Sequence, residues 1–224
     1  MMKTRSSHRF AGRIAAAALA GLLALAPAAP SLAESKAQST LTAADKADIA
    51  RVEAYLNGIH TMQSKFAQLA SNGGLAKGTI YLQRPGKMRV EYDPPVQDII
   101  VATGKVLIHY DGELDQPSYL PQTSSPAAFL LRDQIRLAGD VSVTKVAHSG
   151  NQLLVDVIET GGAEKGALHL VFTDNPLALS QWTVLDAAGK RTEVTLINPQ
   201  FNIPIDPVKF LFETPSRPSQ TPQQ

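Results

Sequence analysis

The segment from Gly78 to Tyr110 constrains the fold most strongly, because four short stretches of alternating apolar and polar residues follow one another in it. The apolar positions are, in order, Ile80 and Leu82; Met88, Val90 and Tyr92; Ile99 and Val101; and Val106, Ile108 and Tyr110. An apolar residue at every second position is typical of a strand with one face in the core and the other in water. We therefore expect four antiparallel strands with all these apolar residues on one face of a common sheet.

Turn residues separate the four stretches. In Arg84-Pro85-Gly86-Lys87, proline supplies the fixed φ that suits the second position of a turn, and glycine supplies a positive φ. Thr103-Gly104-Lys105 gives a similar signal, and Asp93-Pro94-Pro95 interrupts the alternation between the second and third stretches. The segment therefore predicts a series of tight hairpins.

The same alternation continues through most of the chain. Asn72-Gly73-Gly74 is a strong hairpin signal, and Gln116-Pro117 indicates an edge strand or a bulge. Further strands are predicted at 62–70, 113–120, 141–146, 153–158, 167–173, 179–185 and 191–197, with a last short strand at 209–212. The regular spacing predicts a mainly β fold, with a few helices and a single strongly curved antiparallel sheet of about eleven strands.

Two segments have helical patterns instead. Thr42 and Asp45 have the spacing of a capping box, and Asn57-Gly58 is a plausible end for the helix that follows. The apolar residues of this helix, Ile49, Val52, Tyr55, Leu56 and Ile59, fall on one face. The second helix is predicted at 124–132, where serines precede Pro126, and a further short turn of helix at 133–137. We expect both segments to cover the apolar face of the sheet.

The N-terminus resembles an export signal. A basic region, with Lys3, Arg5, Arg9 and Arg13, precedes the apolar run Ile14 to Ala26, which is too short to span a bilayer comfortably. Ser31-Leu32-Ala33 places small residues where signal peptidase cleaves. We therefore expect residues 1–33 to be a cleaved signal peptide and the protein to be exported. A membrane anchor is the less favoured alternative.

Charge and cysteine content exclude several function classes. The first 33 residues hold four of the 21 basic residues and none of the 20 acidic ones, so the remaining chain has a net charge of −3. No basic stripe with interleaved aromatic residues occurs, so we expect no binding to nucleic acid. The absence of cysteine excludes disulfides, thiolate catalysis and an acylated N-terminal cysteine. We expect one soluble, monomeric domain at 34–214 and, because of its proline and glutamine content, a disordered tail at 215–224.

Enzymatic activity has little support. The chain contains no Gly-x-Ser-x-Gly elbow, no His-Glu-x-x-His pair and no phosphate-binding loop. The histidines beyond the signal peptide, His60, His109, His148 and His169, lie on different segments. We therefore expect a protein that is not an enzyme, with no catalytic residues, no metal and no cofactor.

The predicted sheet has more inward-facing apolar positions than its short helices can cover. This surplus leaves two alternatives open: the sheet packs on itself into a closed core, or it surrounds a cavity for an apolar ligand. Burying an acyl chain of about sixteen methylenes, at about 0.8 kcal/mol each, offers roughly 13 kcal/mol before ordering costs. That amount is ample for a soluble carrier.

These residues also carry a resemblance to the LolA family, the periplasmic carriers that move lipoproteins from the inner to the outer membrane. The similarity runs through Gly78 to Tyr110, including Arg84-Pro85-Gly86 and Ile99-Ile100-Val101. It continues in Pro126-Ala127-Ala128-Phe129-Leu130-Leu131, which resembles the family's lid helix, and in Phe210-Leu211-Phe212 with Thr214-Pro215. The resemblance implies an unclosed half-barrel with a helical lid, located in the periplasm.

The resemblance also implies roles for particular residues. Arg84 resembles the arginine at the barrel mouth that holds the closed lid and takes part in cargo transfer from an inner-membrane LolCDE-type ABC transporter. The acyl chains of lipoproteins would contact the cavity and lid, which we expect to be formed by Phe66, Ile80, Leu82, Met88, Val90, Tyr92, Ile99, Val101, Val106, Ile108, Phe129, Leu130, Leu131, Leu170 and Trp182. A LolB-like outer-membrane acceptor would be a further partner.

The chain departs from the family pattern at Met88 and Val90, where the family has bulky aromatic residues, and this implies a more flexible lining. An alternative within the same fold is a periplasmic structural or lipoprotein-sensing module that carries nothing. Acyl chains that copurify with the folded protein would favour the carrier.

Overall fold

The computed structural model describes residues 41–124, 126–160 and 166–215. The predicted signal peptide and residues 216–224 of the predicted tail lie outside this part of the chain. None of the helices within it is long and apolar enough to cross a membrane.

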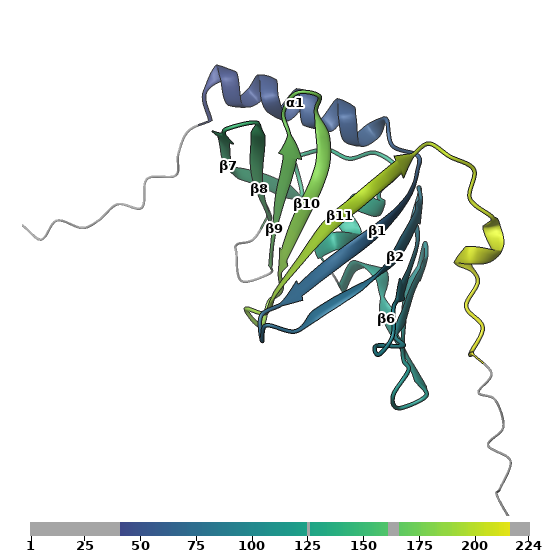
Figure 1. Cartoon of the computed structure of the whole chain (residues 1–224). Coiled ribbons are helices and arrows are strands. Elements are labelled where there is room, and N and C mark those ends of the chain that lie inside the picture. Colours follow the sequence, from purple (N-terminus) through teal and green to yellow (C-terminus); the bar gives the residue numbers. More distant parts are fainter. Residues whose placement is uncertain (1–40, 125, 161–165, 216–224) are drawn as a thin grey trace, which may run out of the picture. The chain divides into compact units, whose positions relative to one another are not determined.

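A single antiparallel sheet dominates the described structure (Figure 1). Its eleven strands are β1 Thr61–Ala70, β2 Leu75–Gln83, β3 Lys87–Tyr92, β4 Ile99–Thr103, β5 Val106–Asp111, β6 Gln116–Pro121, β7 Val141–Ser149, β8 Gln152–Glu159, β9 Ala167–Thr173, β10 Ala178–Leu185 and β11 Arg191–Phe201. They lie in the order β6-β5-β4-β3-β2-β1-β11-β10-β9-β8-β7. The predicted mainly β fold with about eleven strands is therefore confirmed.

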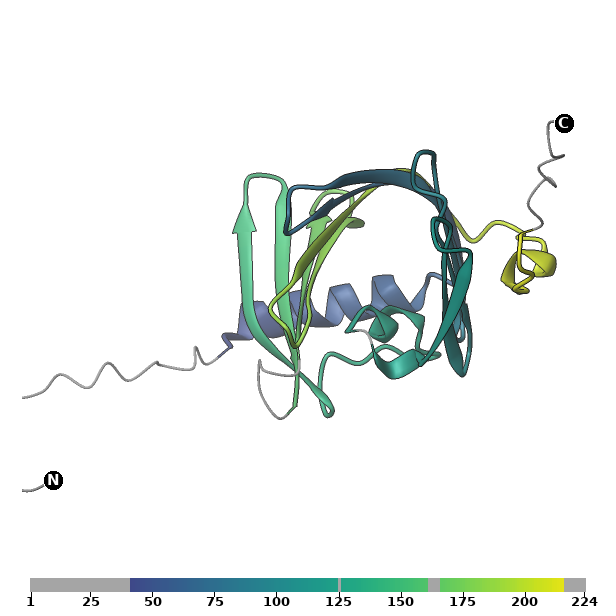
Figure 2. The same ribbon diagram turned by 90° about the horizontal axis from the view of Figure 1, so that it is seen from below.

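The sheet curves strongly but does not close (Figure 2). Pairing between β1 and β11 joins the two halves of the chain, which leaves β6 and β7 as the two edges. This confirms the edge position predicted from Gln116-Pro117. The described chain between the two edge strands, residues 122–124 and 126–140, crosses the open side, and its short helices lie within the curve of the sheet (Figure 2). The predicted half-barrel with a lid is thus present.

Glycines allow the tight turns and one close approach. Gly86 and Gly104 have φ values of +76° and +101°, as the predicted turns require. Gly78 lies within β2, where a Cβ atom would be 2.1 Å from the carbonyl oxygen of Glu91 on the neighbouring strand. Glycine at this position also leaves room for the Phe66 ring, which meets the Tyr92 ring edge to face at 5.4 Å. Strand packing here therefore depends on the missing side chain.

Helix α1, Ala43–Asn57, begins with the predicted capping box. The Asp45 N–H donates to Thr42 Oγ1 at 3.1 Å, and the Thr42 N–H donates to Asp45 Oδ2 at 2.7 Å. The apolar face of the helix packs into the core through the buried Val52 and Leu56. Figure 1 shows α1 crossing one end of the sheet, near β7 to β10. The prediction for this helix is confirmed.

Two predictions for local structure are wrong. The lid consists of short 3₁₀ helices, η1 Gln122–Ser124 and η2 Pro126–Leu131. The first wrong prediction is the further turn of helix at 133–137, where the structure has no helix. The reason lies in α1, whose side chains replace the helical hydrogen bonds of that segment. Asn57 accepts from the Ile135 N–H at 2.8 Å and donates to its carbonyl at 2.9 Å, and Glu53 accepts from the Leu137 N–H at 2.6 Å.

The second error concerns residues 209–212, which were predicted to form a strand. Pro207–Phe210 forms a 3₁₀ helix, η4, and the chain continues without pairing. Asp206 caps this helix by accepting from the Val208 N–H at 2.9 Å, and Pro207 suits a first helical position because it has no N–H to donate. The local capping signal therefore outweighs the short apolar alternation that follows it.

An ionic cluster joins α1 to strand β7 and to the turn that follows β9. His148 on β7 contacts Asp48 of α1 at 2.9 Å and Asp174, which follows β9, at 3.3 Å. Arg51 of α1 bridges the same two carboxylates, at 2.7 Å and 2.9 Å. The hydrogen bond to Asp48 is the main cause that raises the pKa of His148, while the Arg51 hydrogen bond lowers the pKa of Asp174. Asp45 is a further charged neighbour of His148.

The raised pKa of His148 predicts a pH-dependent contribution to stability. The contribution is complete below the ordinary value of 6.5 and is lost as pH rises through the folded-state pKa. We expect the difference in urea midpoint between the wild type and His148→Gln to be largest in mild acid and to shrink above neutral pH. Denaturation curves at a series of pH values measure this difference, and a constant difference would contradict the prediction.

Candidate functional site

A cavity of about 400 Å³ lies between the concave face of the sheet and the lid, within the size range of ligand pockets. We call it the main cavity. It is lined by Phe66, Gln68, Ile80, Met88, Val90, Tyr92, Ile100, Leu107, Gln122, Ala128, Leu131, Trp182, Val184, Asp186, Lys190, Thr192 and Val194. Seven of the predicted contact residues are in this lining: Phe66, Ile80, Met88, Val90, Tyr92, Leu131 and Trp182. The lining is mostly apolar, and its charged residues, Asp186 and Lys190, lie in the turn between β10 and β11.

A small extension of about 40 Å³ continues from the main cavity toward α1. The two hollows share Ile80, Met88, Leu131 and Trp182. The extension also brings in Leu82, Leu130 and Arg84, three further residues of the predicted site. Apolar side chains of the sheet, the lid and α1 therefore surround one continuous apolar region.

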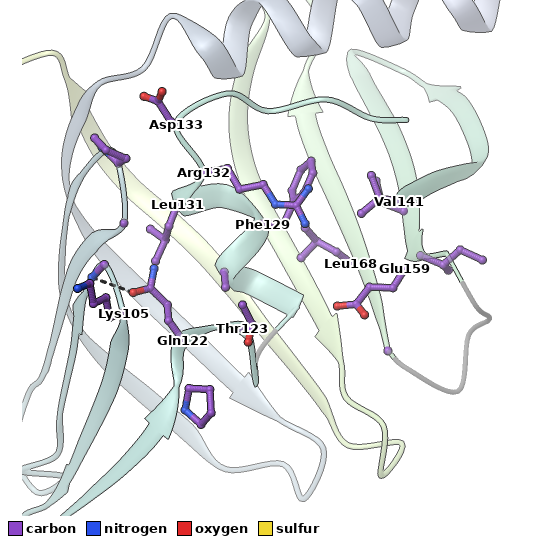
Figure 3. A pocket seen from close by; sticks show the side chains of 18 of the residues that line it. Lys105, Gln122, Thr123, Phe129, Leu131, Arg132, Asp133, Val141, Glu159 and Leu168 are labelled. Carbon is purple, nitrogen blue, oxygen red and sulfur yellow. Dashed lines mark hydrogen bonds between the residues drawn. The ribbon is translucent and has the colours of Figure 1, made fainter. Parts of the chain in front are cut away.

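A third hollow, of about 380 Å³, lies where the lid meets the open side of the sheet (Figure 3). We call it the mouth pocket. Its lining is Pro85, Gly86, Gly104, Lys105, Pro121, Gln122, Thr123, Ala128, Phe129, Leu131, Arg132, Asp133, Val141, Val157, Ile158, Glu159, Gly166, Ala167 and Leu168. The predicted lid residue Phe129 lies here, in contact with the Arg132 guanidinium, which is 4.9 Å from its ring centroid.

Four predicted cavity residues lie on the opposite, convex face of the sheet: Ile99, Val101, Val106 and Ile108. On β4, Val101 pairs with Arg89 of β3, whereas Ile100 pairs with Val90 of β3, which lines the cavity. Directly paired residues share a face, so Ile100, not Val101, faces the cavity. On β5, Leu107 lines the cavity, whereas the predicted residues Val106 and Ile108 do not. The expectation that all the apolar residues of Gly78 to Tyr110 share one face is therefore wrong.

The convex face is apolar there because the C-terminal segment covers it. Helix η4 packs on β3 and β4, and the rings of Tyr110 and Phe212 lie 6.2 Å apart. Val101 is fully buried beneath this cover. Both faces of β4 and β5 are thus partly apolar, so alternation alone could not identify the inner one. Leu170 is also corrected: it is buried in the packed core and lines none of these three hollows.

Arg84 joins the end of α1 to the end of the lid. Its Nε donates to the Ile59 carbonyl at 2.7 Å, and its Nη2 donates to the carbonyls of Leu56 and Ile59. Its Nη1 reaches the Arg132 carbonyl, at 3.4 Å. Burial lowers the pKa of Arg84, and the nearby carboxylate of Asp133 opposes this effect. A half-buried cation is therefore held mainly by carbonyl oxygens.

Two contacts beside Arg84 were not apparent from the sequence. The Gly86 N–H donates to the Leu131 carbonyl at 2.7 Å, which fixes the last turn of the lid to the β2–β3 turn. Gln122 Oε1 accepts from the Gly104 N–H at 2.9 Å, which fixes the first turn of the lid to the β4–β5 turn. Only the turn signals at Gly86 and Gly104 indicated this region. In the described residues, no group of three or more acidic or histidine side chains is arranged to hold a metal ion.

Comparisons with known proteins agree with this geometry. Residues 57–213 match the family model described as "Outer membrane lipoprotein carrier protein LolA". An outer-membrane lipoprotein carrier protein of Chromobacterium violaceum is 29% identical over 181 residues, which cover 75% of this chain and 84% of the relative. A protein of the same name from Azotobacter vinelandii is 28% identical, covering 77% and 86%.

Among solved structures, an uncharacterized conserved protein from Thermus thermophilus is similar, with a TM-score of 0.45 and 13% identity. The match covers 75% of this chain and 94% of that one. A TM-score at this level is too low to support an inference about fold or function.

Proposed function

Because the chain belongs to the LolA family of outer-membrane lipoprotein carrier proteins, we propose that it carries lipoproteins by enclosing their acyl chains in the main cavity. The observation that carries this proposal is the apolar hollow of about 400 Å³ beneath a lid of short 3₁₀ helices. A hollow of this kind leaves apolar side chains without packing partners, and a hydrocarbon chain would supply them. The periplasm is the compartment that suits this function and the predicted export signal.

The energetics favour reversible carriage. Each methylene moved from water to the cavity contributes about 0.8 kcal/mol, so one long chain offsets the cost of moving a lid that is held by few bonds. Short 3₁₀ helices have poorer hydrogen-bond geometry than α-helices, which suits a segment that must move. No covalent step is needed. The cargo leaves when a more apolar acceptor competes for the chains.

Arg84 and its neighbours are proposed to set the state of the lid. Its bonds to the carbonyls of Ile59 and Arg132 hold the lid near α1, and an entering chain would compete with that arrangement. We propose an inner-membrane ABC transporter of the LolCDE type as the donor of cargo and a LolB-like protein as its acceptor. The ligand contacts of the predicted residues that line the cavity are part of the same proposal.

Trp182 offers a direct test, since it is the single tryptophan of the chain and lines both the main cavity and its extension. We expect a triacylated peptide with brominated chains to quench its fluorescence, with the unbrominated peptide as the control. Quenching requires the chains to come close to the ring. A folded protein whose tryptophan is not quenched at saturating peptide would contradict the proposal and favour a module that carries nothing.

A further inference from the structure

The mouth pocket is a direct continuation of the main cavity with a different chemistry. The two hollows share Gln122, Ala128 and Leu131, which form the wall between them. Beyond this wall the lining becomes more polar, and it includes four charged side chains, Lys105, Arg132, Asp133 and Glu159. An amphiphile with its chains in the main cavity would therefore have its head in the mouth pocket.

Among the described residues that line the mouth pocket, the charges balance: Lys105 and Arg132 are basic, and Asp133 and Glu159 are acidic. Figure 3 shows Lys105 and Glu159 on opposite sides of the pocket. The Arg132 guanidinium is already engaged, by the carboxylate of Asp140 at 2.7 Å and by the Phe129 ring.

This arrangement of charges is unfavourable for binding a phosphate group. Phosphate sites in proteins present unopposed Arg or Lys side chains, or the N-terminus of a helix. Here one of the two cations is occupied by Asp140, and the carboxylates of Asp133 and Glu159 would repel an anion. An uncharged head that carries ester and amide groups meets no such repulsion, and it can hydrogen-bond to polar side chains such as Gln122 and Thr123.

We propose, on the basis of the function proposed above, that the mouth pocket is a head-group subsite that selects for uncharged heads. The lipid-modified cysteine of a lipoprotein has such a head, since its chains are attached through esters and an amide. The head of an anionic phospholipid with equally long chains is disfavoured, because the carboxylates of Asp133 and Glu159 repel its phosphate and Asp140 already occupies one of the two cations. The mouth pocket thereby distinguishes cargo from bulk membrane lipid, which the apolar cavity alone cannot do.

Charge reversal at Glu159 tests this subsite. The probes are a triacylated peptide without charged side chains and phosphatidylglycerol, both with brominated chains, and the readout is quenching of Trp182. The wild type should prefer the peptide. In Glu159→Lys, repulsion of the phosphate becomes attraction, so phosphatidylglycerol should bind about tenfold more tightly while the affinity for the peptide changes less than about twofold. Glu213→Lys is the matched control, because it makes the same charge change at an exposed site outside the pocket and should leave both affinities unchanged.

The outcomes separate the two proposals. If neither probe quenches Trp182 in the wild type, the carrier function fails. If both probes bind the wild type equally, or if Glu159→Lys shifts neither affinity, the cavity holds chains but the head-group subsite is wrong. An equal gain for phosphatidylglycerol in Glu213→Lys would attribute the effect to net charge and would likewise overturn the subsite.

Discussion

Arg84→Leu is expected to fold but to lose most of its capacity to receive lipoproteins from the donor transporter. The substitution removes the guanidinium that donates to the carbonyls of Leu56, Ile59 and Arg132. A hydrogen bond from a charged donor contributes about 1.5–3 kcal/mol, and the bond to the Arg132 carbonyl is the one that reaches the lid, so the balance between closed and open lid should shift by about that amount. A shift of that size changes the population of the lid states by about one to two orders of magnitude. Transfer that requires both states then stalls.

The measurement is lipoprotein release from proteoliposomes that contain the donor transporter, with circular dichroism to confirm folding. Arg84→Lys should be intermediate, because one ammonium group cannot reproduce the planar set of donors that reaches several carbonyls. Arg191→Leu removes an exposed arginine whose ion pair with Glu193 is far less buried, and it should release cargo like the wild type. Release by a folded Arg84→Leu at the wild-type rate would remove Arg84 from the mechanism.

The sequence was sufficient to predict the fold because its local signals agree with one another. Alternating residues located all eleven described strands within a few positions, and turn residues located the hairpins at Gly73, Gly86 and Gly104. The capping box at Thr42 located the start of α1. Each of these features depends on a few neighbouring residues, so it could be identified without knowledge of tertiary contacts.

The errors share a different cause, which is contact between segments distant in sequence. Residues 133–137 are held in a non-helical form by Asn57 and Glu53, which are 78 and 84 positions from the residues they bind. The inner face of β4 could not be assigned from the sequence, because both of its faces are covered. The C-terminal segment covers the outer face, so Val101 is buried there although it does not line the cavity. The roles of Gly86 and Gln122 in fixing the lid also depend on such contacts.

Neighbouring isoleucines on β4 allow the face assignment and the cavity to be tested together. Ile100 lines the main cavity, and Ile99 points to the convex face, where it pairs with Glu91. Ile100→Asp should weaken binding of a brominated triacylated peptide at least about a hundredfold, since burying an unpaired carboxylate against a hydrocarbon chain costs several kcal/mol. Ile99→Asp, the same change one position earlier, should bind the peptide within about twofold of the wild type.

Acid should restore binding in the cavity variant alone. A bound chain buries the carboxylate of Ile100→Asp and raises its pKa, so protonation is linked to binding and affinity should rise as pH falls. The wild type and Ile99→Asp lack this carboxylate and should show no such recovery. Titrations of Trp182 quenching at several pH values measure both effects, because neither variant adds a second tryptophan. Equal loss of binding in the two variants would mean that chains do not enter along the concave face, since only that face distinguishes the two residues.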